Sequence, residues 1–252
     1  MRIRLNWRAV LSILSFFVIW NLCVIFKVAG FTEIPGPIEV LVVLFNEFLF
    51  TADYWQSWLI SFERVLWGFV IAQVLGIPLG LFLGSSTTFR NLVFPVFEMM
   101  RPIPPLAWVP LSILFWPTNE SSIIFITFIG AFFIITINVF EGVQSIKKEH
   151  IWLAKSLGAN DFRIFVFVMI PAVIPAIAVG MSLGIAVTWN VVIAAEMIAS
   201  DSGLGRLTWE GYVSSTAPVV IVGMISIGLA GFISTLLVDL LERRMMPWKY
   251  KR

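Results

Sequence analysis

The sequence predicts an all-α polytopic membrane protein with about six transmembrane helices. Of its 252 residues, 59% are hydrophobic and only 13% are charged, and the mean hydropathy is +0.95. Soluble domains average about 45–50% apolar and about 25% charged residues. The apolar residues gather into runs of membrane-spanning length, separated by short charged segments. With no internal repeat or separate soluble segment, residues 1–252 are expected to form a single transmembrane domain.

Six apolar runs account for the expected spans. The first follows three arginines near the N-terminus, a pattern that is also typical of a signal peptide, but its length suits a spanning helix. Residues 31–58 contain acidic residues and no Lys or Arg, and we expect residues 38–50 to form a helix on the membrane surface. The expected spans are residues 9–26, 59–83, 92–115, 123–140, 173–198 and 219–241.

Prolines interrupt the third apolar run. So many prolines do not fit one regular helix, and broken backbone at membrane depth is tolerated only where protein or a water-filled cavity covers it. Glu98 and Arg101 are three residues apart and can pair on one helix face. Either they hold the broken span at a cavity, or Arg101 lies near the cytoplasmic interface and extends its charge into water. The prolines are Pro95, Pro102, Pro104, Pro105 and Pro110.

The basic residues predict the orientation of the chain. Six spans place both termini on one side of the membrane. Of the 17 Lys and Arg residues, only Lys27, Arg64 and Arg206 fall on the opposite side. Because loops rich in Lys and Arg stay in the cytoplasm, we expect both termini and the long loop of residues 142–171 to be cytoplasmic.

The 142–171 loop is the longest segment that does not suit the lipid interior. Its apolar spacing predicts a short helix, after which Gly158 suits a left-handed position and Asn160 suits the N-cap of a second helix. Such a rigid double helix suits docking onto a partner, although its flanking lysines would also suit anionic lipid headgroups. The apolar stripe comprises Ile146, Ile151, Ala154 and Leu157, and the lysines are Lys147, Lys148 and Lys155.

The sequence lacks a catalytic or metal-binding constellation. It contains one cysteine, Cys23, in the first apolar run and one histidine, His150, in the 142–171 loop, whereas zinc and haem sites need several such ligands. It also lacks the Gly-x-x-x-x-Gly-Lys-Ser/Thr motif of P-loop ATPases, and its basic residues lie at span ends rather than on a nucleic-acid-binding face. We therefore expect a transport protein without metal, cofactor or enzymatic activity. A secondary transporter or channel is the alternative, and a membrane-embedded enzyme is a weaker one.

The 142–171 loop resembles the EAA loop of bacterial ABC-importer permeases, the membrane subunits of binding-protein-dependent uptake systems. That family pattern is Glu-Ala-Ala, three residues, Gly, nine residues and Ile-x-Leu-Pro. Ala154, Gly158 and Pro171 match it. Trp152 and Leu153 stand in place of the Glu and the first Ala, so the docking contact expected here is more apolar than the family motif.

Three further stretches resemble the taurine, aliphatic sulfonate and nitrate branch of these permeases. Residues 101–111, RPIPPLAWVPL, are similar to the third-span motif of the branch, and residues 61–69 are similar to its second-span entry. Residues 194–198, followed by SGLG at residues 202–205, are similar to the end of its fifth span. The motifs occur in the family's order, and the resemblance covers about residues 35–245.

The resemblance implies a type I ABC importer permease fold in the bacterial inner membrane. Its implied partners are a cytoplasmic ATPase dimer that binds ATP and Mg²⁺, a second permease copy, and a periplasmic or lipid-anchored binding protein. The implied cargo is a small anion, namely taurine, another sulfonate, nitrate or bicarbonate. The implied ATPase-docking residues are Trp152, Leu153, Ala154, Lys155, Leu157, Gly158 and Pro171. The implied pathway or gate residues are Glu98, Arg101, Pro104, Trp108, Asn190 and Glu196, and the implied binding-protein contacts are Ser202, Gly203 and Gly205.

Two of these residues also have simpler interpretations. Glu196, near the outer end of the fifth run, can be an interfacial acid rather than a gate. Asn190 can serve an interhelical hydrogen bond, which a polar group at membrane depth needs. The SGLG stretch is expected to form a tight turn on the outer side under either interpretation.

Overall fold

The fold is an elongated bundle of helices in a computed structural model that describes residues 7–28, 30 and 33–250, without the side chains of Ala9, Lys249 and Tyr250. Arg2, Arg4, Lys251 and Arg252, which enter the charge count above, lie outside the described residues. Its helices are α1 (Trp7–Ile25), α2 (Pro37–Val43), η1 (Leu44–Phe48), α3 (Ala52–Ser85), α4 (Thr87–Met100), η2 (Pro105–Trp108), α5 (Val109–Phe115), α6 (Asn119–Gln144), α7 (Lys148–Ser156), α8 (Asp161–Ile164), η3 (Phe165–Met169), α9 (Ile170–Ala199), α10 (Leu204–Val213), α11 (Ala217–Met245) and α12 (Pro247–Tyr250).

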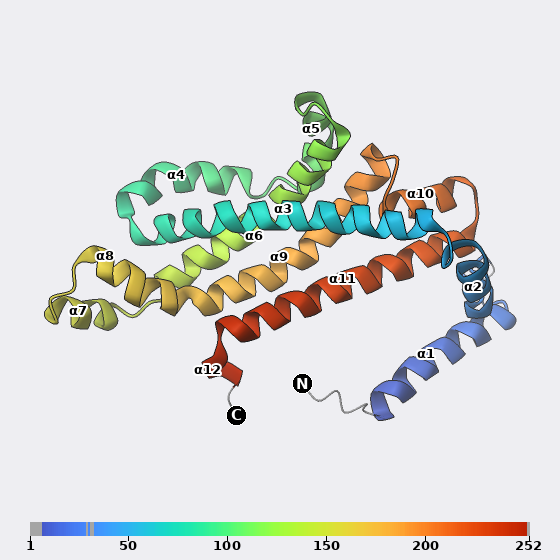
Figure 1. Cartoon of the computed structure of the whole chain (residues 1–252), viewed down its shortest axis with the longest axis horizontal. Coiled ribbons are helices and arrows are strands. Elements are labelled where there is room, and N and C mark those ends of the chain that lie inside the picture. The colour runs from blue at the N-terminus through green and yellow to red at the C-terminus, as the bar shows by residue number, and fades with distance from the viewer. Residues whose placement is uncertain (1–6, 29, 31–32, 251–252) are drawn as a thin grey trace.

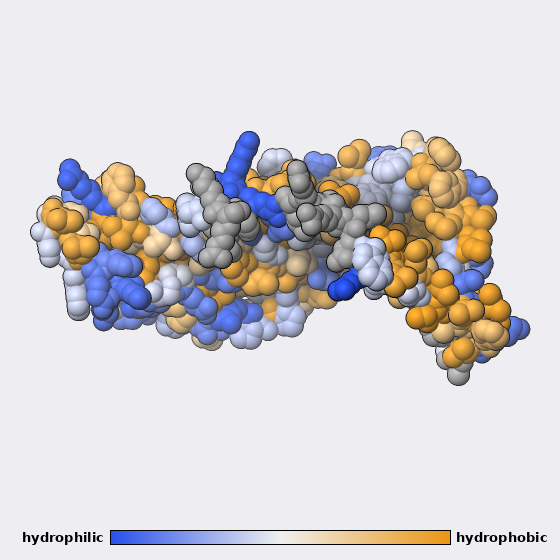
Figure 2. Space-filling model, turned by 90° about the horizontal axis from the view of Figure 1, so that it is seen from below, coloured by the Kyte–Doolittle hydropathy of each residue, from blue (hydrophilic) through white to orange (hydrophobic). Residues whose placement is uncertain are grey.

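Four helical segments are long and apolar enough to cross a membrane. They are α3, α6, the continuous run of residues 161–199 that ends with α9, and α11. The all-α class and the second, fourth, fifth and sixth expected spans are therefore confirmed. The first expected span forms α1, whose apolar part covers residues 10–25 and is shorter than the others. Figure 2 shows hydrophobic surface exposed along the molecule, as lipid contact requires.

The third expected span is a broken helix. It consists of α4, the short 3₁₀ helix η2 and α5, with no helix between Arg101 and Pro104. Prolines cause the break, because each lacks an N–H donor and disfavours helical backbone at the residue before it. The hydroxyl of Ser122 in α6 donates to the Ser112 carbonyl 3.0 Å away and so ties α5 to the bundle.

The core of the bundle is the contact of α3 with α6 and α9. Small residues recur every fourth position along α3, so the α6 backbone approaches closely. A Cβ atom on Gly80 would lie 2.7 Å from the Thr136 carbonyl oxygen, and one on Gly84 would lie 2.4 Å from the Val143 Cβ. The small residues are Gly68, Ala72, Gly76, Gly80 and Gly84.

The two ends of the bundle differ. In Figure 1, α7 and α8 lie at one end of the long axis, and α2 and α10 lie at the other. The helix predicted over residues 38–50 is observed as α2 and η1, and its Val40 packs with Tyr54 and Val222. The Tyr54 hydroxyl lies 2.7 Å from the Ser226 hydroxyl and joins α3 to α11 at this end.

Candidate functional site

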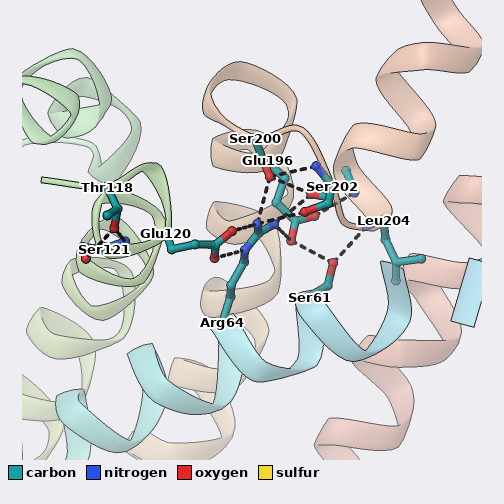
Figure 3. A network of polar contacts seen from close by, with 10 residues as sticks. Ser61, Arg64, Thr118, Glu120, Ser121, Glu196, Ser200, Ser202 and Leu204 are labelled. Carbon is teal, nitrogen blue, oxygen red and sulfur yellow. Dashed lines mark hydrogen bonds and ion pairs between the residues drawn. The ribbon is translucent and has the colours of Figure 1, made fainter. Parts of the chain in front are cut away.

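A buried network of charged and polar groups lies at the α10 end of the bundle. We call it the Arg64 network; it contains Ser61, Arg64, Glu120, Glu196, Ser200 and Ser202 (Figure 3). Arg64 reaches it from α3, Glu120 from the first turn of α6 and Glu196 from the last turns of α9. Three membrane helices therefore meet at one guanidinium group.

The Arg64 guanidinium uses all five of its N–H donors. Nε donates to the Glu120 Oε2 at 2.8 Å, and Nη2 donates to the other Glu120 oxygen and to the Ser200 hydroxyl. Nη1 donates to the Glu196 Oε1 and to the Ser202 carbonyl, each at 2.9 Å. The Arg64 and Glu196 side chains are 1% and 0% exposed, whereas Glu120 is 57% exposed. The Arg64–Glu196 pair is thus fully buried, and Glu120 covers its open side.

The turn before α10 wraps around the Glu196 carboxylate. The Ser61 hydroxyl donates to Oε1 at 2.7 Å, and the Gly205 N–H donates to Oε2 at 2.8 Å. Gly203 has a φ of +108°, and a Cβ atom there would lie 2.6 Å from this carboxylate. A Cβ atom on Gly205 would lie 2.5 Å from the Ile193 carbonyl oxygen. Both glycines are therefore required by the way in which the turn encloses Glu196.

The structure accordingly brings Glu196, Ser202 and Gly205 together with three residues that were not among the expected site residues, although two of them lie in the 61–69 stretch. These are Ser61, Arg64 and Glu120, which come from two other helices. The available signal was Arg64 itself, because a charged residue inside an apolar helix needs a partner. The network holds no free nucleophile or unpaired base, so the arrangement is suited to holding helix ends together and not to a chemical reaction. Glu196 is fully buried rather than an interfacial acid.

Glu98 and Arg101 lie at the break in the third span. The Arg101 Nη1 donates to the Glu98 Oε1 at 2.9 Å, and both side chains are partly exposed. The 14 residues of α4 place Arg101 about 21 Å along the helix from the turn at Ser86. Among the described residues, no hydrogen bond or ion pair joins this pair to the Arg64 network.

The other expected pathway residues are dispersed. Pro104 precedes η2, and Trp108, which ends it, lines a cavity of about 320 Å³ beside Trp116 and Phe125. Asn190 is exposed, and its Nδ2 donates to the Ala186 carbonyl of its own helix at 2.9 Å rather than to another helix. The interhelical hydrogen bond considered for Asn190 is therefore not observed. In the part of the chain that the structure describes, no three His, Cys, Asp or Glu side chains group as metal ligands would.

The 142–171 loop forms the predicted helix, glycine and helix. Gly158, with a φ of +82°, follows α7, and its N–H donates to the Lys155 carbonyl at 2.9 Å. The Asn160 side chain caps α8 by accepting from the Arg163 N–H at 2.8 Å. Lys155 pairs with Asp161 across the turn at 3.3 Å. The turn between the two helices is therefore held by hydrogen bonds and one ion pair.

The exposed apolar face of this loop differs from the predicted stripe. Ile146 is half-buried against the core, and Ile151 and Ala154 are half-buried on α7, which packs against α8 and η3. Trp152 is 62% exposed and Leu157 is 80% exposed. Pro171 lies at the start of α9, directly after the π-helical turn η3. The exposed large apolar residues of the double helix are Trp152, Leu153, Leu157 and Phe162.

Comparison with known proteins agrees with this architecture. Residues 76–247 match the family model described as binding-protein-dependent transport system inner membrane component. A candidate ABC transporter permease of Methanocaldococcus jannaschii is 39% identical over 92% of this chain and 88% of its own length. The taurine transport permease TauC of Escherichia coli is 32% identical, covering 85% of this chain and 80% of its own. The nitrate import permease NrtB of Leptolyngbya laminosa is 33% identical, covering 79% and 71%.

Solved structures share the fold at low sequence identity. A bacterial ABC transporter that imports the polysaccharide alginate matches with a TM-score of 0.61 and 14% identity, over 96% of this chain and 97% of that one. The inward-facing MetNI methionine transporter matches with a TM-score of 0.60 and 19% identity, over 77% and 94%. The fold is therefore that of type I ABC importer permeases. With the family match over most of its length, the chain belongs to the binding-protein-dependent transport system inner membrane components, in the branch of ABC importer permeases that includes taurine and nitrate permeases.

Proposed function

We propose that this permease passes a small anionic solute, of the taurine, sulfonate, nitrate or bicarbonate class, from a binding protein outside the cell to the cytoplasm. The chain would act in the bacterial inner membrane with a second copy of itself. ATP and Mg²⁺ would be bound by a separate cytoplasmic ATPase dimer. The taurine and nitrate permeases among its relatives support this cargo class, and the excess of Lys and Arg beside the 142–171 loop supports the orientation.

The observation that carries the proposal is the exposed double helix of the 142–171 loop. Trp152, Leu153 and Leu157 expose apolar side chains on a segment whose charged residues do not suit the lipid interior. Exposed apolar surface outside the lipid-facing belt is typical of a protein interface. Because α7 ends just before the left-handed Gly158 and Asn160 caps the start of α8, the surface is rigid and can transmit a force. Ala154 and Lys155 would support this contact, and Pro171 would begin the helix behind it.

The remaining residues are assigned to the transport path and to the outer surface. Glu98, Arg101, Pro104 and Trp108 would line the path at the broken span, with Asn190 on α9 exposed to it. Glu196 would act as a gate residue by holding the outer helix ends together. The turn around Ser202 would contact the binding protein, since the α10 end of the bundle lies opposite the 142–171 loop. Gly203 and Gly205 are buried and would support this contact by shaping the turn and the start of α10.

The docking assignment is tested by co-purification of the tagged permease with a candidate cognate ATPase. Trp152→Ala and Leu157→Ala are expected to reduce the recovered ATPase, because each removes exposed apolar contact area. Phe50→Ala is the matched control, since Phe50 is also exposed but follows η1 at the opposite end of the molecule. If the native chain recovers no ATPase, or if all three variants behave alike, the proposed docking contact is wrong. Uptake that follows an ion gradient without ATP would favour a secondary transporter instead.

A further inference from the structure

The break in the third span lies beside the middle of α6, which corresponds to the middle of the membrane if α6 spans it. The Phe97 ring, one turn before the end of α4, packs against the Phe133 ring at 5.2 Å between centroids. Phe133 lies near the middle of α6, which crosses the membrane as one helix from Asn119 to Gln144. Non-helical backbone at this depth occurs where it lines a cavity, and discontinuous helices commonly form the substrate sites of transporters.

A cavity of about 520 Å³ opens at this break, between α6 and α9. Its walls are mostly apolar and include Phe133 and Ile134 of α6 and Leu183 of α9. Two polar side chains line it as well, Arg101 from the break and Asn138 from α6. The cavity thus combines a cationic group, an amide group and an apolar wall, which is the usual composition of a small-molecule site.

Most N–H donors of Arg101 take part in no described hydrogen bond. Its described hydrogen bond engages Nη1 with Glu98, whereas a guanidinium carries five N–H donors, and its side chain is 45% exposed. Asn138 donates through Nδ2 to the Ile134 carbonyl at 2.8 Å, and the second hydrogen of that amide takes part in no other described bond. A cation inside a span is costly and usually marks an ion or substrate path. Arg101 is therefore placed to bind an anion inside the cavity.

We propose that Arg101 and Asn138 bind the oxoanion group of the cargo, a sulfonate, nitrate or bicarbonate, while the apolar walls contact the rest of it. This inference rests on the proposed transport function and names the cargo contacts within it. The planar guanidinium matches the oxygen atoms of a sulfonate or nitrate through paired N–H donors, which an ammonium group cannot reproduce. The anion would take the donors that Glu98 does not use and share the positive charge with that carboxylate. Neutral and cationic solutes gain no such contact, so Arg101 would select the charge of the cargo inside the membrane.

The test uses the complete complex of permease, ATPase and binding protein in lipid vesicles, with radiolabelled taurine as the first probe and nitrate as the second. Anion uptake and ATP hydrolysis are measured in the same vesicles. Arg101→Gln is expected to lower the anion taken up per ATP hydrolysed by about tenfold or more, the factor for one lost charge-assisted hydrogen bond. The ratio for Arg101→Lys should fall between those of the native protein and Arg101→Gln. Asn138→Leu should lower the ratio less than Arg101→Gln does. ATP hydrolysis that depends on the binding protein should remain.

Arg90→Gln is the matched control, because Arg90 lies in the first turn of α4, the helix whose C-cap is Arg101, and does not line the cavity. The double variant Glu98→Gln/Arg101→Gln removes the whole ion pair and serves if Arg101→Gln alone fails to assemble; it too should show the low ratio. A native ratio in an assembled Arg101→Gln or double variant would overturn the inference and leave the proposed function intact. A native complex that does not assemble, or that takes up neither anion, would overturn the proposed function itself.

Discussion

Glu196→Gln probes the Arg64 network with the smallest change in shape. The Glu196 carboxylate accepts three hydrogen bonds, from Ser61 and Arg64 at Oε1 and from the Gly205 N–H at Oε2. A glutamine must place its NH₂ group at one of these two positions. Whichever it takes, a donor then faces a donor, and the buried guanidinium loses one of its two negative partners.

The expected loss follows from burial. Removing one partner of a fully buried ion pair costs about 3–5 kcal/mol, and the lower end applies here because Arg64 keeps Glu120. For a protein of this size, about 3 kcal/mol corresponds to a drop of roughly 6–12 °C in Tm. Glu120→Gln is the matched comparison, because Glu120 contacts the same guanidinium but is largely exposed. Arg64 keeps the buried Glu196 in this variant, and water reaches the side chain at position 120, so the loss should be smaller, about 1 kcal/mol, and Tm should fall by only about 2–4 °C.

The assay heats the detergent-solubilised protein through a series of temperatures and measures the folded fraction by size-exclusion chromatography. Arg64→Met and the double variant Arg64→Met/Glu196→Gln complete a double-mutant cycle. Because removal of both charges leaves no uncompensated buried ion, the double variant should lose less than the sum of the single losses, by about 0.5–3 kcal/mol. Equal Tm values for Glu196→Gln and Glu120→Gln, or strictly additive losses in the cycle, would refute the argument from burial.

Two glycine positions give further predictions in the same assay, with Gly228→Ala as the common control. Gly80→Ala is expected to cost about 1–3 kcal/mol, because the added methyl group would lie 2.7 Å from the Thr136 carbonyl oxygen on α6. Gly203→Ala should lower Tm by at least as much, since its φ is +108° and the methyl group would meet the Glu196 carboxylate. Gly228 is helical with open space around it, so its replacement should leave Tm unchanged or raise it. A Gly80 variant as stable as the Gly228 control would show that α3 and α6 are not closely packed.

The spans and the 142–171 loop could be predicted because their signals are local in sequence. A long apolar run is a helix in a membrane whatever it contacts, and prolines close together break one wherever they lie. Gly158 and Asn160 act on their own backbone neighbours, so their positions identify the ends of α7 and α8. The exposed face of α7 was predicted less well, because the side that turns toward the bundle depends on packing rather than on spacing.

The Arg64 network could not be predicted in the same way. Its ion pairs join residues 56 and 132 positions apart, and a single sequence does not indicate which helix ends meet. Glu196 was selected through a resemblance. Glu120 carries no comparable signal, because an acidic residue in the first turn of a helix is common. The cost of a buried charge implies that Arg64 needs a partner, but the identity of the partner requires the fold.

The Arg64 network and the 142–171 loop lie at opposite ends of the same pair of helices. Glu120 is the second residue of α6, which runs about 39 Å before the chain enters α7. The chain returns through α8 and α9, and Glu196 stands in the last turn of α9. A displacement of α7 and α8 would therefore act on the two helices whose far ends Arg64 holds together. If an ATPase moves this loop as proposed, the Arg64–Glu196 pair would be one of the contacts that oppose the motion at the opposite end of the bundle, so the strength of that pair would help to set how readily this end opens.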